Sequence, residues 1–284
     1  MKKRIKFLIK KIIFTIRFNF RKLIGGRRMK PSFMIVGAQK AGTTSLYHYL
    51  IQHPSIKSAL KKEVNYFDKN YYKGDSWYKA FFPIEKNDNS ITGEATPFYM
   101  FHPLSMKRLA EYNPNFKIIV LLREPASRAI SHYYHEVRNK REEQSMREAF
   151  ENESKRLEGE WDNIKNNPKH DCYNLQRYSY KARGLYANQI KEILAHFNED
   201  NLMVIDSKKF FKETQNTVKD VLEFLEVNSD LKIKTQKKFN IGTYTKDPDE
   251  KIILTELKEF YKEPNEKLFK MIGKRFDWDK NHKA

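Results

Sequence analysis

The sequence predicts a single α/β domain in which helices cover both faces of a central parallel sheet. Three short apolar runs, at residues 33–36, 118–122 and 202–205, are typical of buried parallel strands. Helical patterns alternate with these runs, and a glycine-bounded loop follows the first of them directly. The 284 residues suffice for one sizeable core, and neither a Gly/Ser/Pro-rich linker nor an internal repeat divides the chain.

The helices are predicted from apolar residues that recur at three- and four-residue steps. They are expected from the loop to about residue 53, and over residues 126–138, 187–196, 215–226 and 250–272. The highly charged stretch from about 139 to 183 has no pattern from which an element can be predicted.

Residues 1–30 form a basic segment that precedes a domain of residues 31–284. The segment carries twelve Lys or Arg and no acid, and the first acidic residue of the chain is Glu63. Most of the net charge of +19 therefore lies in this segment, and the domain is only mildly basic. Its apolar residues recur at helical spacing between the cations, which predicts a basic amphipathic helix that contacts an anionic membrane through residues 1–24. A helix packed on its own domain or on a second subunit is the alternative.

The same segment fits other roles poorly. Cations interrupt it before an apolar run reaches the ~20 residues that cross a bilayer, and it lacks the cleavage site of a secretory signal. It also lacks a motif that reads DNA or RNA, so no nucleic-acid partner is expected. We expect a cytoplasmic protein, held peripherally on the inner face of the membrane.

Cysteine and histidine usage limits the chemistry. The single cysteine, Cys172, excludes an intramolecular disulfide and an all-cysteine metal site. The eight histidines show no pair at ligand spacing, so the sequence predicts no metal.

The glycine-bounded loop is the strongest local signal, because a strand, a loop and a helix in this order place loop amides and a helix N-terminus around an anion. It comprises Gly37, Ala38, Gln39, Lys40, Ala41, Gly42, Thr43 and Thr44. Its glycines have the spacing of a Walker A motif, but Thr-Thr replaces the Lys-Ser/Thr pair and the lysine lies inside the loop. One lysine, with loop amides and threonine hydroxyls, suits a phosphate–sulfate bridge, which needs no obligatory metal.

Residues 33–54, FMIVGAQKAGTTSLYHYLIQHP, resemble the 5′-phosphosulfate loop of sulfotransferases that use 3′-phosphoadenosine 5′-phosphosulfate (PAPS). The similarity is greatest to the heparan-sulfate N- and O-sulfotransferase branch and its bacterial relatives, and it extends from about Pro31 to Asp279. It implies PAPS as co-substrate and the loop residues as its binding site. The tail from Phe260 to Trp278 also resembles the end of the same branch, which implies a turn at Glu263-Pro264-Asn265 and a structural role for Trp278.

Two further segments complete the donor site that the resemblance implies. Family members bind the 3′-phosphate through an arginine at a strand end and a serine on the next helix, which match Arg123 and Ser131. A guanidinium can chelate two phosphate oxygens, although Arg123 could instead pair with Glu124. Gly242 fits a loop that wraps the same phosphate in many relatives, but Ile241 stands where they carry lysine.

The resemblance also implies the catalytic residues. Glu63, in the segment KKEVNYFD, matches the general base, and Lys40 would stabilise charge on the leaving phosphate oxygen. The attack is expected in line, without a covalent enzyme intermediate. Alternatively, Glu63 is a surface carboxylate that pairs with Lys61 or Lys62.

Nearby positions bear on the acceptor. Asn65 replaces the histidine of the O-sulfotransferases, Asp68 matches a supporting family position, and Glu94 is a second candidate acid/base. The neighbouring aromatic residues could stack on sugar rings or belong to the core; they are Tyr66, Tyr71, Tyr72, Trp77 and Tyr78.

The predicted function is transfer of a sulfuryl group from PAPS to a hydroxyl or amine of a glycan, either a polysaccharide or a lipid-linked saccharide. Two alternatives remain. A P-loop kinase or NTPase would use Asp206 at the end of a strand shaped like Walker B, although an aspartate there commonly serves as a local cap. A non-catalytic protein on the same scaffold would bind membranes or polyanions without turnover.

Overall fold

The computed structural model describes residues 2–23, 27–86, 88–167, 169–230, 232–234 and 245–278. The strands are β1 (Phe33–Gly37), β2 (Ile56–Ser58), β3 (Ile91–Ala95), β4 (Lys117–Leu122) and β5 (Leu202–Asp206). The first helices are α1 (Lys2–Leu23), α2 (Thr43–Leu50), α3 (Asp75–Lys79), α4 (Ser105–Tyr112) and α5 (Pro125–Arg138). They are followed by α6 (Met146–Glu151), α7 (Glu153–Arg156), α8 (Glu160–Asn166), α9 (Tyr173–Arg177) and α10 (Tyr186–Leu194). The last are α11 (Ser207–Lys212), α12 (Thr214–Phe224) and α13 (Glu250–Met271).

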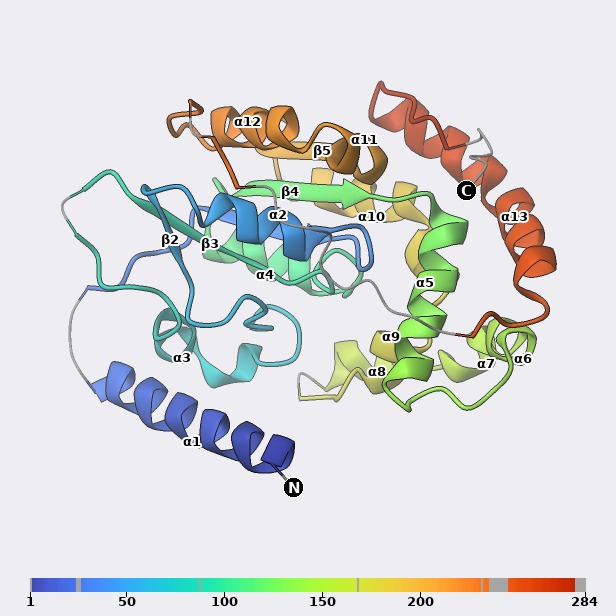
Figure 1. Ribbon diagram of the computed structural model, residues 1–284, viewed down its shortest axis with the longest axis horizontal. Coiled ribbons are helices and arrows are strands. Elements are labelled where there is room, and N and C mark those ends of the chain that lie inside the picture. Colours follow the sequence, from blue (N-terminus) through green and yellow to red (C-terminus); the bar gives the residue numbers. More distant parts are fainter. Residues whose placement is uncertain are drawn as a thin grey trace.

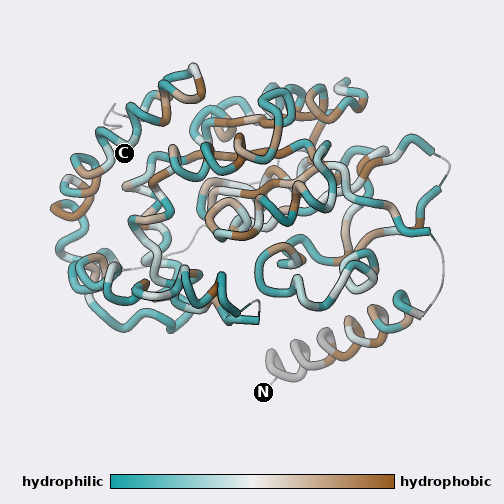
Figure 2. Tube along the Cα trace, turned by 180° about the vertical axis from the view of Figure 1, so that it is seen from behind, coloured by the Kyte–Doolittle hydropathy of each residue, from teal (hydrophilic) through white to brown (hydrophobic). Residues whose placement is uncertain are grey.

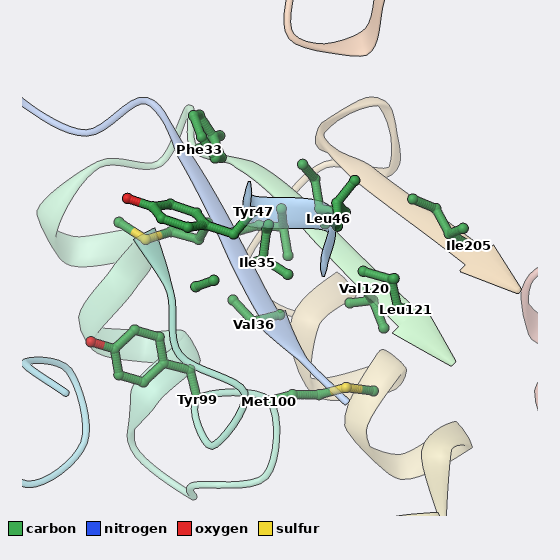
Figure 3. Close-up of a cluster of buried hydrophobic side chains, with 14 of the residues drawn as sticks. Phe33, Ile35, Val36, Leu46, Tyr47, Tyr99, Met100, Val120, Leu121 and Ile205 are labelled. Atoms are coloured by element: carbon green, nitrogen blue, oxygen red, sulfur yellow. The ribbon is translucent and has the colours of Figure 1, made fainter. Parts of the chain in front are cut away.

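The strands form one parallel sheet in the order β2-β3-β1-β4-β5. Figure 1 shows α2, α11 and α12 in front of the sheet, and α4 and α10 behind it. The central strands are buried on both faces, and Figure 3 shows their side chains packed against α2 and the segment around Met100. This is the predicted fold, and it places the carboxyl ends of all strands at one edge.

The predicted strands and helices are confirmed with small shifts at their ends. The short strands β2 and β3 were not predicted, and the charged stretch 139–183 folds into α6 to α9. The turn expected at residues 263–265 is wrong, because Pro264 lies inside α13. This helix buries Tyr261 before the proline and Leu268 after it, so core packing on both sides favours a continuous helix.

The N-terminal segment forms α1, which packs on the domain through one face. Phe18 is buried, and its ring lies 4.7 Å from the ring of Phe81 and 6.0 Å from that of Trp77 on α3. The Arg21 guanidinium donates to the carbonyl oxygens of Ala80 (2.8 Å) and Phe82. The alternative that the helix packs on its own domain is therefore confirmed for this face. The domain boundary at residue 31 and the contact with a membrane stay predictions. No helix in the described ranges is long and apolar enough to cross a bilayer.

Candidate active site

A cavity of about 1090 Å³ opens at the carboxyl edge of the sheet, where ligands of open α/β sheets bind. Residues directly after β1, β4 and β5 line it, together with segments that follow β2 and β3. Eight of the predicted site residues reach its wall: Gln39, Lys40, Gly42, Thr43, Thr44, Glu63, Arg123 and Ser131. Gly37, Ala38 and Ala41 lie in the same loop but do not line the cavity. Gly242 and the neighbouring Ile241 fall outside the described residues.

Both glycines of the loop are required by its geometry. A Cβ on Gly37 would lie 2.6 Å from Sδ of Met100, which packs against the end of β1 (Figure 3). Gly42 has a φ of 104°, a conformation that glycine adopts without strain, and a Cβ there would meet the Phe211 ring at 2.8 Å. The loop can therefore turn tightly and deliver the chain into α2.

The loop ends at a helix N-terminus that faces the cavity. The N–H groups of the first turn of α2 have no partner within the helix, and Gly42 before it has no side chain that could cap them. Thr43, Thr44 and Ser45 of this turn line the cavity. Together with the helix dipole, these donors favour a bound anion.

Lys40 lies beside other cations. Burial, then Arg138 and Arg123, lower the pKa of Lys40 to about 8, because each disfavours the charged ammonium group. Burial, then Lys40, lowers the pKa of His135 to about 4, so this cavity residue is neutral at pH 7. A bound anion would relieve the repulsion among these cations.

Arg183 supports the loop from the side, a role that the sequence does not reveal. Its buried guanidinium donates to Oε1 of Gln39 (2.6 Å) and lies over the rings of Phe98 (4.8 Å) and Phe101 (5.2 Å). Burial, then Arg128, lowers the pKa of Arg183 to about 9. Arg128, by contrast, is fully buried and does not line the cavity.

Glu63 lines the cavity and is tied to the loop by its neighbour. Nζ of Lys62 lies 2.9 Å from Oε1 of Glu63 and donates to Oγ1 of Thr44 at 2.8 Å. The Glu63–Lys62 pair of the alternative therefore forms, with the Glu63 side chain 45% exposed, and Glu63 lines the cavity although Lys62 does not. One lysine thus connects the candidate base to the first turn of α2.

Glu94 and Asp68 lie below the wall. Glu94 is fully buried and does not line the cavity, so it cannot reach an acceptor as the second acid/base candidate. Burial raises its pKa to about 7, although four donors bond to its carboxylate. Asp68 is also buried and accepts a hydrogen bond from the Asn65 amide at 2.9 Å, which orients this cavity residue. Both acids position the segment that carries Glu63.

Arg123 and Ser131, which the resemblance implies for the 3′-phosphate, both line the cavity. Arg123 directly follows β4, and its guanidinium donates to the carbonyl oxygen of Lys40 at 3.4 Å. The Glu124 carboxylate caps α5 by accepting from the N–H groups of Ala126 (2.8 Å) and Ser127 (2.7 Å). The Glu124 carboxylate therefore has a structural role as a helix cap, and this cap orients α5 so that Ser131 faces the cavity.

Asp206, the residue of the kinase alternative, has a local role. Its Oδ1 accepts from the N–H of Lys208 (3.2 Å), which caps α11, and from Nε1 of Trp278 (3.3 Å). Of the aromatic residues near Glu63, Tyr66 and Tyr78 are buried and stack at 4.4 Å. Tyr71 and Trp77 are partly buried against the core, Tyr72 is exposed, and none of the five lines the cavity.

The wall has more basic than acidic side chains. Its cations are Lys40, Lys69, Arg123, Arg177, Arg183, Lys208, Lys212 and Lys258, and its acids are Glu63, Glu124, Asp206 and Asp277. Most of these cations come from segments without a motif, so sequence reasoning missed them.

Comparison with known proteins gives a consistent result. Residues 30–282 match the family model described as a sulfotransferase domain. The chain is 34% identical over 204 residues to mouse bifunctional heparan sulfate N-deacetylase/N-sulfotransferase 4, which aligns 69% of this chain but only 22% of that protein. It is 26% identical over 280 residues to mouse heparan sulfate glucosamine 3-O-sulfotransferase 3A1, covering 89% of this chain and 66% of the relative. A crystal structure of a sulfotransferase from Alicyclobacillus acidocaldarius superimposes with a TM-score of 0.70 at 29% identity, over 88% of this chain and 99% of that one.

Proposed function

Because the chain belongs to the sulfotransferase domain family, we propose that it transfers a sulfuryl group from PAPS to a hydroxyl or amine of a glycan. The observation that carries the proposal is that Lys40 and Glu63 line one cavity and are linked through Lys62 and the first turn of α2. A cation for the leaving group and a carboxylate for the acceptor proton are the two groups that direct transfer requires.

The proposed donor would contact the cavity at two places. Loop amides, the N-terminus of α2 and Lys40 would hold the 5′-phosphosulfate, and Arg123 with Ser131 would hold the 3′-phosphate. Arg123 contacts the Lys40 carbonyl, so the two phosphate sites share one wall. The volume of about 1090 Å³ leaves room for a second substrate beside the nucleotide.

The transfer would proceed in one step. The acceptor oxygen or nitrogen bonds to sulfur while the bond between sulfur and the bridging phosphate oxygen breaks. Glu63 takes the proton that the acceptor loses, and the ammonium group of Lys40 balances the charge that the phosphate oxygen gains. Nearby, Lys62 holds the Glu63 carboxylate at the wall.

An anionic saccharide is the acceptor that the wall favours. Lys69 and Arg177 line the cavity and carry no role in donor binding, and the Lys69 ammonium contacts Oε1 of Gln176 at 3.3 Å. The relatives whose names state heparan sulfate act on such a polymer. Cations at this place would attract an acidic glycan chain.

Calorimetric titration tests the donor. Adenosine 3′,5′-bisphosphate should bind the wild type, and Lys40→Ala and Arg123→Ala should each weaken binding by about tenfold or more. The exposed Lys107→Ala, on α4, should leave affinity unchanged. A preference for ATP with Mg²⁺, or equal binding by all variants, would contradict the donor assignment. Sulfate transfer from PAPS to a panel of acidic and neutral glycans then tests the acceptor.

A further inference from the structure

The face of α1 that points away from the domain is strongly apolar. Its members are isoleucines and one phenylalanine, each half-exposed or more: Ile9, Ile12, Ile13, Ile16 and Phe20. Figure 2 shows apolar residues recurring along the described turns of α1, which lies at the periphery of the molecule. Exposed apolar residues that gather on one helix mark an interaction surface, whereas scattered ones do not.

Helix geometry separates this face from the one that packs on the domain. Phe14, Phe18 and Arg21 follow one another at steps of four and three residues and contact the domain. At about 100° per residue, Ile16 lies roughly on the opposite side of the helix axis, and Ile13 lies at the edge of the same exposed face. Packing against the domain therefore holds the helix in place and leaves the isoleucine face outward.

The charge around this face decides between its possible occupants. Residues 1–30 carry twelve Lys or Arg and no acidic residue. A second copy of the same segment would bring like charge against like charge, without acids to compensate. An anionic lipid surface complements both features, because acyl chains receive the apolar face and headgroups attract the cations.

We propose that the outward face of α1 seats the protein on an anionic bilayer surface. The helix lies in the interface plane, with Ile9, Ile13 and Ile16 inserted at the boundary of the acyl chains. The face toward the domain, with Phe18 and Arg21, stays bound to residues 77–82, so the domain is attached to the bilayer as a unit. This surface is independent of the reaction proposed above.

Vesicle flotation of the full chain tests the proposal. The protein should float with vesicles of equal parts phosphatidylcholine and phosphatidylglycerol, and much less with phosphatidylcholine alone or at high salt. Ile13→Glu with Ile16→Glu should reduce binding by about tenfold or more. The matched control is Ile252→Glu with Phe260→Glu on α13, which changes two exposed apolar residues elsewhere and should leave binding unchanged.

Each outcome decides the proposal. Because the substituted residues are exposed, both double variants should unfold at the same temperature as the wild type. If the variant with Ile13→Glu and Ile16→Glu unfolds at a lower temperature, Ile9→Glu with Phe20→Glu is tested in its place. Failure of the wild type to float with anionic vesicles, or equal flotation of all variants, would overturn it. A second result would also overturn it: light scattering shows a dimer, Ile13→Glu with Ile16→Glu dissociates this dimer, and vesicles do not bind. The outward face of α1 would then join two copies of the chain.

Discussion

The Glu94 carboxylate accepts a hydrogen bond from the backbone N–H of Val64 at 3.0 Å, and Val64 directly follows the candidate base Glu63. The hydroxyls of Tyr78 (2.9 Å), Thr96 (2.8 Å) and Tyr99 (3.0 Å) hold the same carboxylate. A buried acid on β3 therefore fixes the main chain that presents Glu63 to the cavity. This makes Glu94 a positioning residue, with consequences for stability that depend on pH.

Glu94→Gln should change the pH dependence of stability. Burial raises the pKa of Glu94 from 4.5 to about 7 in the folded protein, so its contribution is present below pH 4.5 and is lost as pH rises through 7. Between pH 5 and pH 8 the wild type should lose roughly 2 to 3 kcal/mol relative to Glu94→Gln. Urea unfolding of both proteins at the two pH values measures this difference. A constant difference would show that Glu94 does not titrate in this range.

Binding of adenosine 3′,5′-bisphosphate should take up a proton near pH 8. The free protein holds Lys40 at a pKa of about 8 because of burial and the cations Arg138 and Arg123, and a bound anion restores the charged form. Affinity should fall roughly tenfold from pH 7 to pH 9. Calorimetry in buffers of different ionisation enthalpy counts the proton, and Lys40→Met should abolish both effects. Proton uptake that persists in this variant would assign it to another group.

Glu63→Gln should reduce kcat by about 10²- to 10⁴-fold, because the acceptor proton loses its base. Affinity for the bisphosphate should stay within a few-fold of the wild type, since the carboxylate contributes no donor contact in the proposed reaction. Glu111→Gln removes a carboxylate from another Lys–Glu pair, on α4, and serves as the control. A Glu63→Gln enzyme with wild-type turnover would remove Glu63 from the reaction.

Lys62→Ala should act through Glu63. It removes both the 2.9 Å contact to Glu63 and the hydrogen bond to Thr44, so kcat should fall about tenfold with little change in KM. If Lys62 only positions Glu63, the double variant with Glu63→Gln should be no slower than Glu63→Gln alone. Additive losses would instead give Lys62 a contact of its own in the reaction.

Gly42→Ala should destabilise the protein and weaken donor binding. Its φ of 104° strains an alanine, and the new Cβ would lie 2.8 Å from the Phe211 ring. Gly159→Ala is the matched control, since Gly159 has a φ of 72° and a ψ of −10°, close to the ψ of 11° at Gly42, and its added Cβ would meet only Nδ2 of Asn163, at 3.9 Å. The free energy of unfolding should fall by about 1–3 kcal/mol more for Gly42→Ala than for the control. Equal losses would mean that Phe211 moves aside freely.

The sequence predicts the central strands because β1 and β4 are buried on both faces and read as unbroken apolar runs. The sequence does not predict β3, because Gly93 and Glu94 interrupt the apolar pattern of this strand. A Cβ on Gly93 would lie 2.4 Å from the Phe33 carbonyl oxygen, and Glu94 is buried only with four donors around it. The close packing at Gly93 and the hydrogen bonds to Glu94 therefore require residues that do not fit the apolar pattern by which a buried strand is predicted.

One part of the candidate site can be predicted from the sequence, and another part cannot. The loop that carries Lys40 is predictable because its residues are contiguous and each has a local reason to be there, as Gly42 does. The contacts of Lys62 with Thr44 and of Arg183 with Gln39 join segments far apart in the chain. Because only the folded sheet brings these side chains together, no local sequence pattern predicts their contacts.

The cavity wall begins at Gln39 and ends at Trp278, whose indole bonds to Asp206 at the end of β5 and packs on Tyr186. A growing chain on the ribosome therefore presents the loop long before the far wall exists. The proposed nucleotide affinity is therefore expected only after synthesis and folding of the domain are complete. Capture on an immobilised adenosine 3′,5′-bisphosphate resin would accordingly select intact molecules over chains truncated by early termination or proteolysis.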